Sequence, residues 1–253
     1  MGKTKPQDPI MQLKQVSLAT PLGSSYLLKD ISFSIPRGEW LAVVGASGAG
    51  KTTLLRLLNR LIEPTSGSIK FNHQDLNKLN SLELRRQVVL VLQEPKLLGM
   101  PVQQALAYPL MLQKVAAGEI NRRVSHWINI LSIPQEWLER NELQLSLGQR
   151  QLVTIARALI MEPKLLLLDE PTSALDVGNA MHVMEVLQNL VATGKTSILM
   201  VNHQLQLVEQ FSDRVLHLDQ GQLRQDQSNS EVNWQELHHK IAQARIQTEA
   251  EWE

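Results

Sequence analysis

The sequence contains no cysteine, no long apolar run and no excess of charge of either sign. Without cysteine, the chain can form neither disulfides nor thiolate metal sites. No stretch of about 18 residues is continuously apolar, so no membrane-spanning helix is predicted. Twenty-five basic residues balance 25 acidic ones, whereas a protein that grips a nucleic-acid backbone carries a basic excess. We therefore expect no nucleic acid among its partners.

Aromatic residues are also scarce, at 4% of the 253 residues, whereas 43% are hydrophobic and 20% are charged. This composition is typical of an ordinary globular chain that can bury a full core. Residues 1–9 lack the apolar segment of a secretory signal, and we interpret them as a flexible lead-in.

A phosphate-binding loop is the clearest motif that is present. An apolar run at residues 41–44 predicts a buried strand before it, and leucines at helical spacing from Leu54 to Leu61 predict a helix after it. Backbone N–H groups of such a loop surround an anion that the positive end of the helix faces. Lys51 would neutralise phosphate oxygens, and the Thr52 hydroxyl would bind Mg²⁺. The candidate ATP-binding residues are Gly45, Ala46, Ser47, Gly48, Ala49, Gly50, Lys51, Thr52 and Thr53.

Residues 11–35 alternate between apolar and polar side chains around a glycine-serine turn, which predicts an antiparallel hairpin. Tyr26 is the only tyrosine in this hairpin, so it is a candidate to stack on a nucleotide base. The alternative interpretation is a half-buried ring that packs on a strand.

Three predicted buried strands end in polar side chains. These are Gln93 after residues 88–92, Asp169 and Glu170 after residues 165–168, and Asn202 and His203 after residues 197–201. The carboxyl ends of strands are where α/β sheets place ligand groups. Asp169 would hold Mg²⁺ through its water shell, and Glu170 would orient or deprotonate the attacking water. We expect His203 to contact the γ-phosphate, whereas a single glutamine such as Gln93 at a strand end is by itself typical of an ordinary loop residue.

Between residues 94 and 157 the pattern is helical, with an apolar stripe from Ile120 to Leu131. We interpret Trp127 and Trp137 in this region as core residues. Its last helix begins after Leu145-Ser146-Leu147-Gly148-Gln149, where Ser146 is placed to cap it and to create a second anion site.

In their order and spacing, these motifs resemble those of ATP-binding-cassette (ABC) ATPases over residues 11–223. The matching parts are the phosphate loop, Gln93, residues 145–149, the Asp169-Glu170 pair, residues 173–176 and His203. The resemblance implies an α/β fold with a P-loop NTPase core, a mainly parallel sheet, an N-terminal antiparallel hairpin region and a helical subdomain inserted at residues 94–157. Residues 224–253 would form a C-terminal tail with an amphipathic helix.

The resemblance also implies that two copies of the chain sandwich two ATP molecules, each with a Mg²⁺ that Gln93 would reach. Each site would combine the phosphate loop of one copy with Ser146, Gly148, Gln149 and Asp176 of the other. Gly148 would preserve a close backbone approach to phosphate. The pattern departs from the family at Leu147, where glycine is usual, so a side chain would lie close to the partner's nucleotide.

A chain of this family without a membrane span would power solute transport through a separate permease, from the cytoplasmic face of the membrane. The loop after Gln93 would be part of the docking surface. Its apolar residues Leu97, Leu98 and Met100 would either meet the permease or pack on the chain's own helices.

Other functions remain as alternatives at this point. An ABC ATPase that regulates a cell-envelope machine without transport fits the same sequence. One that acts on nucleic acid or ribosomes usually has a coiled-coil insertion, a second cassette or a basic surface, and none is visible. A guanine-nucleotide switch would need Asn-Lys-x-Asp, whereas residues 77–80 end in asparagine. Within the transporters, the chain resembles iron-export ATPases and, more distantly, phosphate-import ATPases, which leaves substrate and direction open.

Overall fold

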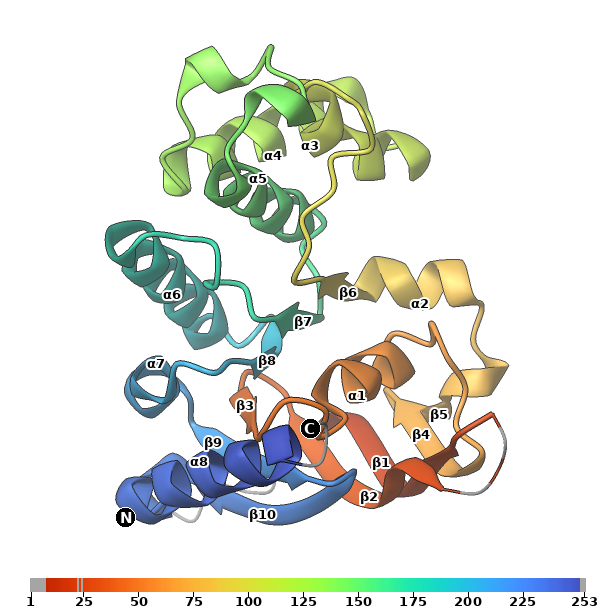
Figure 1. The fold of residues 1–253 in the computed structure, drawn as a ribbon. Helices are drawn as coiled ribbons and strands as arrows, with labels where there is room; N and C mark the ends of the chain where they lie inside the picture. The colour runs from red at the N-terminus through yellow and green to blue at the C-terminus, as the bar shows by residue number, and fades with distance from the viewer. Residues whose placement is uncertain (1–7, 22, 24, 251–253) are drawn as a thin grey trace, which may run out of the picture.

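Two β-sheets form the framework of the chain, which a computed structural model describes for residues 8–21, 23 and 25–250 (Figure 1). The larger sheet has the order β10-β9-β3-β8-β7-β6. Its strands are β3 (Trp40–Val44), β6 (Val88–Val91), β7 (Leu165–Asp169), β8 (Ser197–Val201), β9 (Arg214–Asp219) and β10 (Gln222–Ser228). Four neighbouring pairs are parallel, and β9 and β10 form an antiparallel hairpin. The predicted mainly parallel sheet is confirmed.

The smaller sheet is antiparallel, with the order β2-β1-β4-β5. Its strands are β1 (Pro9–Ala19), β2 (Tyr26–Pro36), β4 (Ser66–Phe71) and β5 (Gln74–Asp75). The hairpin predicted at residues 11–35 is therefore confirmed. Residues 1–7 of the predicted lead-in lie outside the described residues, and Pro9 already belongs to β1.

Helices lie around the larger sheet and at one end of the molecule. They are α1 (Lys51–Leu58), α2 (Ser81–Gln87), α3 (Val102–Leu112), α4 (Ala117–Ile130), α5 (Leu147–Ile160), α6 (Val177–Ala192), α7 (Leu205–Phe211) and α8 (Trp234–Ala250). Figure 1 shows α3, α4 and α5 gathered at the end farthest from the antiparallel sheet. None of the described helices is long and apolar enough to cross a membrane.

Both faces of the parallel sheet are buried, and this explains its continuous apolar strands. In β7, Leu165 and Leu167 belong to the core that contains α1 and the antiparallel sheet. Leu166 and Leu168 point the other way, into the core formed with α3 to α6. Side chains alternate along a strand, so a run of leucines supplies both cores.

The leucine pattern after the phosphate loop predicts a longer helix than the structure contains. Helix α1 ends at Leu58, and Leu61 is exposed. Arg60 takes a left-handed backbone conformation with φ 54°, which ends the helix. The guanidinium of Arg85 donates to the carbonyl groups of Asn59 and Arg60 and replaces the helical hydrogen bonds lost there.

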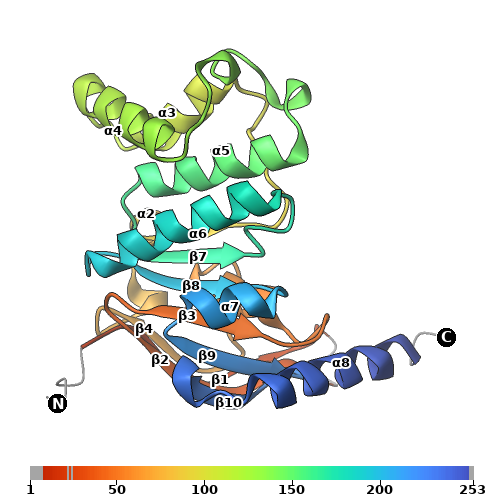
Figure 2. The ribbon, with the colours of Figure 1, turned by 90° about the vertical axis from the view of Figure 1, so that its left-hand side faces the viewer.

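Helix α8 packs beside β9 and β10, as Figure 2 shows, so the predicted tail does contain a helix. Leu237 is buried in a small core with Val44 and Val208, and Trp234 packs against it. Ala242, farther along the same helix, is exposed. Strand β10 also runs past the predicted domain end at residue 223, because its ladder with β9 continues to Ser228.

A leucine pair tests the burial of the central sheet. We expect Leu167→Ala to lower the free energy of unfolding by about 2–5 kcal/mol, because it leaves a cavity beneath β7. The matched control is Leu143→Ala, since that side chain is 94% exposed, and its effect should stay within about 0.5 kcal/mol. Urea denaturation followed by circular dichroism measures both variants. Similar losses in the two would contradict this packing.

Candidate functional site

The phosphate loop joins β3 to α1, and its glycines are required by the backbone. A Cβ atom on Gly45 would lie 2.0 Å from the carbonyl oxygen of Leu218. Gly50 precedes α1 with φ 98°, in the left-handed region that side chains disfavour. The loop therefore holds its shape against β9 only with glycine at these positions.

Lys51 lies inside the loop and is only 6% exposed. Its Nζ donates to the carbonyl oxygens of Gly45 (2.9 Å) and Ala46 (2.7 Å). Burial lowers the pKa of Lys51, and the nearby carboxylates of Glu170 and Asp169 oppose this shift. An ammonium group has three donors, so one remains for a ligand in front of the loop.

A cavity of about 430 Å³ opens in front of the loop. It brings together most of the residues predicted for the nucleotide site: Tyr26, Ser47, Gly48, Gly50, Lys51, Thr52, Thr53, Gln93, Glu170 and His203. Gly45, Ala46 and Ala49 are buried and do not line it. Tyr26 lines the cavity and is 53% exposed, so its stacking on a nucleotide base stays a prediction beside the alternative of a half-buried ring on the strand.

Glu170 is held at the edge of this cavity by two side chains. Its Oε1 lies 2.5 Å from Nε2 of His203, and its Oε2 accepts a hydrogen bond from Nε2 of Gln93 at 3.1 Å. The residue has φ 50°, and its N–H donates to the carbonyl of Val201 at 2.9 Å. A left-handed residue at the end of β7 thus turns the carboxylate toward the groups that follow β6 and β8.

Asp169 and Thr52 together fit a Mg²⁺ ion. Asp169 is 2% exposed, and its Oδ1 has no hydrogen-bond partner among the described residues. Burial raises the pKa of Asp169, while a hydrogen bond from the Thr52 hydroxyl lowers it. Hard oxygen ligands, one of them buried and unpaired, suit Mg²⁺. A neighbouring cavity of about 580 Å³ is lined by Asp169, Thr52 and Gln93, so the three can reach one space.

Three residues of the nucleotide cavity were missed by sequence reasoning: Leu27, Gln220 and Gly221. Gly221 donates its N–H to the carbonyl of Ala49 (3.2 Å) and accepts from the N–H of Lys29 (2.8 Å). Gln220 and Gly221 lie in the turn that joins β9 to β10. Its place beside the phosphate loop follows from the parallel pairing of β3 with β9, which no local pattern reveals.

The remaining predicted site residues line a different cavity, of about 500 Å³. These are Ser146, Gly148, Gln149 and Asp176, with Leu147 and Trp137 beside them. Ser146 caps α5 in a capping box with Gln149, as predicted from the sequence. Trp137 is only partly buried, which modifies its interpretation as a core residue. Within one chain, these residues are not brought to the phosphate loop.

The backbone of the chain's own residues requires glycine at position 148, which the sequence did not reveal. A Cβ atom there would lie 2.6 Å from the carbonyl oxygen of Ala174. The glycine thus allows α5 to contact residues 173–176, in addition to the phosphate approach predicted from the sequence. Asp176 caps α6 through the N–H of Asn179 (2.9 Å), and this hydrogen bond lowers the pKa of Asp176.

The apolar residues after Gln93 divide between the two predicted fates. Leu97 is buried and Met100 is partly buried, and both pack against the core with α3 to α5. Leu98 is exposed. Only Leu98 of these three therefore remains available to a partner.

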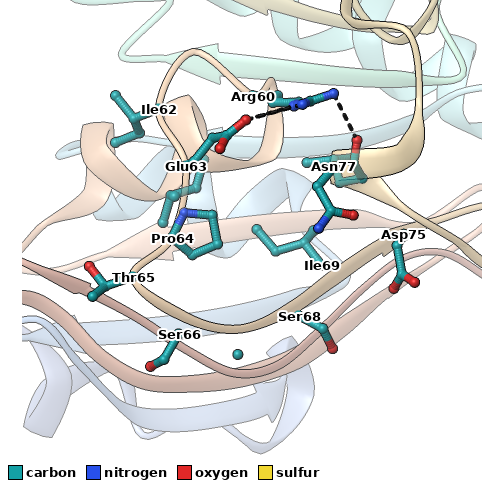
Figure 3. A pocket seen from close by; sticks show the side chains of 13 residues that line it. Arg60, Ile62, Glu63, Pro64, Thr65, Ser66, Ser68, Ile69, Asp75 and Asn77 are labelled. Carbon is teal, nitrogen blue, oxygen red and sulfur yellow. Dashed lines mark hydrogen bonds and ion pairs between the residues drawn. The ribbon is translucent and has the colours of Figure 1, made fainter.

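Figure 3 shows a further hollow, of about 170 Å³, between the end of α1 and β4. Arg60 lies at this hollow and donates to Glu63 (3.1 Å) and to the carbonyl of Leu76 (3.3 Å). The hollow shares no lining residue with the cavities described above. It is therefore separate from the candidate site.

Comparison with known proteins places this geometry in a family. Residues 28–173, more than half of the chain, match the family described as ABC transporter. The chain is 36% identical over 229 residues to the methionine import ATP-binding protein MetN of Mannheimia succiniciproducens, covering 88% of this chain and 66% of that protein. MetN of Photorhabdus laumondii is 37% identical over 225 residues, with 87% and 65% covered. The chain thus spans just under two thirds of the length of these relatives.

Solved structures agree. A dimeric post-hydrolysis state of the ATP-binding cassette MJ0796, bound to ADP and Pi, has 26% identity and a TM-score of 0.79, covering 87% of this chain and 98% of that one. The cbiO1 protein of Clostridium perfringens, described as part of the ABC transporter complex cbiONQ, has 27% identity and a TM-score of 0.81, with 96% and 100% covered. With its motifs, its fold and these relatives, the chain belongs to the ABC transporter family of ATP-binding proteins.

Proposed function

We propose that the chain binds Mg-ATP in the cavity before the phosphate loop and hydrolyses it to power solute transport. The observation that carries this proposal is the Glu170 carboxylate, which His203 and Gln93 hold at the edge of that cavity. A carboxylate fixed beside a phosphate site can orient water and accept its proton. Similarity to a cassette in a post-hydrolysis state with ADP and Pi supports the same reaction.

The other side chains have matching roles in this proposal. Loop N–H groups and the N-terminus of α1 bind the phosphates, and the free donor of Lys51 neutralises them. His203 contacts the γ-phosphate, and the exposed ring of Tyr26 stacks on the base. Thr52, Gln93 and Asp169 would hold Mg²⁺, Asp169 through water. When bound, the ion neutralises charge on the phosphate oxygens.

A complete site needs a second copy of the chain. The phosphate loop and the group formed by Ser146, Gly148, Gln149 and Asp176 line different cavities of one molecule. We propose that this group meets the ATP bound by the partner copy, so that two chains enclose two nucleotides. Leu147 is exposed beside it and would lie near that nucleotide.

We further propose that the nucleotide-binding domain expected at residues 11–223 extends over residues 9–228, because β1 and β10 run to these limits, that 94–157 form its inserted helical subdomain, and that the rest of the predicted 224–253 segment forms a tail. The partner is a separate membrane permease on whose cytoplasmic face the chain lies, with Leu98 in the docking surface. Relatives are named for methionine import, whereas the resemblance to iron-export and phosphate-import ATPases stays a prediction. The permease would decide the substrate.

Glu170→Gln tests the ATPase. We expect this variant to bind Mg-ATP, to lose at least about 100-fold in kcat, and to accumulate as a dimer, because the closed state no longer reopens by hydrolysis. Steady-state phosphate release measures kcat, and light scattering at saturating Mg-ATP measures the mass. Glu185→Gln, an exposed glutamate on α6, is the control and should behave as wild type. A variant that stays monomeric would contradict the sandwich.

Asp169→Asn tests the metal site. Because burial raises the pKa of Asp169, the stability that this group contributes is lost as the pH rises through the raised value. At neutral pH without Mg-ATP, the variant should therefore melt a few degrees higher than wild type, and this advantage should shrink as the pH falls toward 3.8, the ordinary pKa. Mg-ATP should stabilise it less than wild type. Differential scanning calorimetry measures Tm for both proteins under each condition. A lower Tm for the variant than for wild type, at neutral pH without Mg-ATP, would contradict a destabilising buried carboxylate at Asp169.

Affinity purification of the tagged chain from detergent-solubilised membranes of its own organism tests the partner. We expect a stoichiometric protein with many membrane spans, and expect Leu98→Glu to remove it, because a buried charge disrupts an apolar contact. Leu61→Glu, another exposed leucine, is the control. A partner with few spans and a large outer domain would instead support the regulator of a cell-envelope machine. Recovery of soluble proteins alone would overturn the transport proposal.

A further inference from the structure

Asn202 joins the two loops that carry Glu170 and His203, although it lines neither of the site's cavities. Its side chain is only 3% exposed. The Nδ2 group donates to the hydroxyl of Thr172 at 3.2 Å, and Oδ1 accepts from the N–H of Gln204 at 2.9 Å. One buried amide therefore uses its donor on one loop and its acceptor on the other.

The acceptor side of this amide controls the backbone around His203. The hydrogen bond from Gln204 to Asn202 spans two residues, which is the geometry of an Asx turn, and His203 is the residue between them. The imidazole is about half exposed, and Glu170 is its only side-chain partner within the described residues. With so few contacts of its own, the ring depends on this turn for its direction.

The donor side of the amide fixes the segment that follows Glu170. Glu170 adopts φ 50°, a conformation that persists only where surrounding contacts hold it. Its N–H is bound by the carbonyl of Val201, and two residues later the buried Thr172 is bound by Asn202. Val201 and Asn202, which follow each other at the end of β8, thus bind the backbone of Glu170 and the side chain of Thr172.

We propose that Asn202 and Thr172 are positioning residues, whose hydrogen bond keeps the His203 imidazole and the Glu170 carboxylate in the geometry that hydrolysis requires. This inference rests on the proposed ATPase function. Asparagine suits the task because its amide donates and accepts at once, whereas a serine or threonine hydroxyl in its place would be too short to reach across to Thr172. Neither residue touches the nucleotide cavity, so their loss should affect the reaction and leave ATP binding intact.

Paired substitutions at Thr172 test the proposal in the full-length chain. Thr172→Val keeps the shape but removes the acceptor, and we expect kcat to fall about tenfold while the Kd for Mg-ATP stays within about twofold. Thr172→Ser keeps the hydroxyl and should restore most of the wild-type kcat. Phosphate release at saturating Mg-ATP gives kcat, and fluorescence titration with Mg-ATP in the Glu170→Gln background gives Kd.

Thr196→Val is the matched control for loss of a buried threonine hydroxyl. Thr196 is also buried, its hydroxyl donates to the carbonyl of Pro163 at 2.8 Å, and it precedes β8 at the opposite end of that strand. We expect it to lower Tm much as Thr172→Val does, but to leave kcat unchanged. A fall in kcat that tracks the loss of Tm in both variants would reduce the role of Thr172 to stability and overturn the proposal.

The reciprocal change completes a double-mutant cycle. Asn202→Ser can still accept from the Gln204 N–H but loses the contact with Thr172, so adding Thr172→Val to it should lower kcat little further. Additive losses would show that the two residues act separately and would overturn the proposal. If wild type hydrolyses ATP and Thr172→Val does so equally well, this inference alone fails. If wild type hydrolyses no ATP, the proposed function fails, and the inference fails with it.

Discussion

The parallel pairing of β3, β8 and β7 is the constraint on which the site depends. In this ladder Val201 is opposite both Val43 and Asp169, so the three strands reach the same edge of the sheet at one level. The phosphate loop begins two residues after Val43, Glu170 follows Asp169, and His203 lies two residues beyond Val201. A shift of one residue in any of these registers would exchange the faces of the strand and separate the groups.

The same edge concentrates opposite charges away from water. Lys51 and Asp169 are both buried, and burial shifts the pKa of each toward its neutral form. The lysine donates to two loop carbonyls, whereas one oxygen of the aspartate has no partner among the described residues. A phosphate chain with its cation would supply partners to both groups. These buried charges suit a ligand that would pair with them, and they lower the stability of the chain without that ligand.

Contacts also link the nucleotide cavity to the second cavity, which Ser146, Gly148 and Gln149 line at the start of α5. The loop after Gln93 is bound to α5 by Arg157, which donates to the carbonyl of Lys96 at 2.9 Å. It is bound again by Glu142, which accepts from the N–H of Leu97 at 3.1 Å and lies 3.7 Å from Arg150 of α5. The loop after Gln93 and the helix that Ser146 caps are therefore joined by a continuous chain of hydrogen bonds and one ion pair.

The sequence by itself determined the phosphate loop, the strands that end in Asp169 and His203, and the Ser146 cap, because each depends on residues close together in the chain. It also determined the family, through the order of these motifs. Only the tertiary structure decided that Gly221 lies against the phosphate loop, that Gly148 is required by the carbonyl of Ala174, and that Asn202 holds Thr172, 30 residues away. These contacts join segments that the parallel ladder brings together, and no local pattern encodes which strands will be neighbours or in which register they pair.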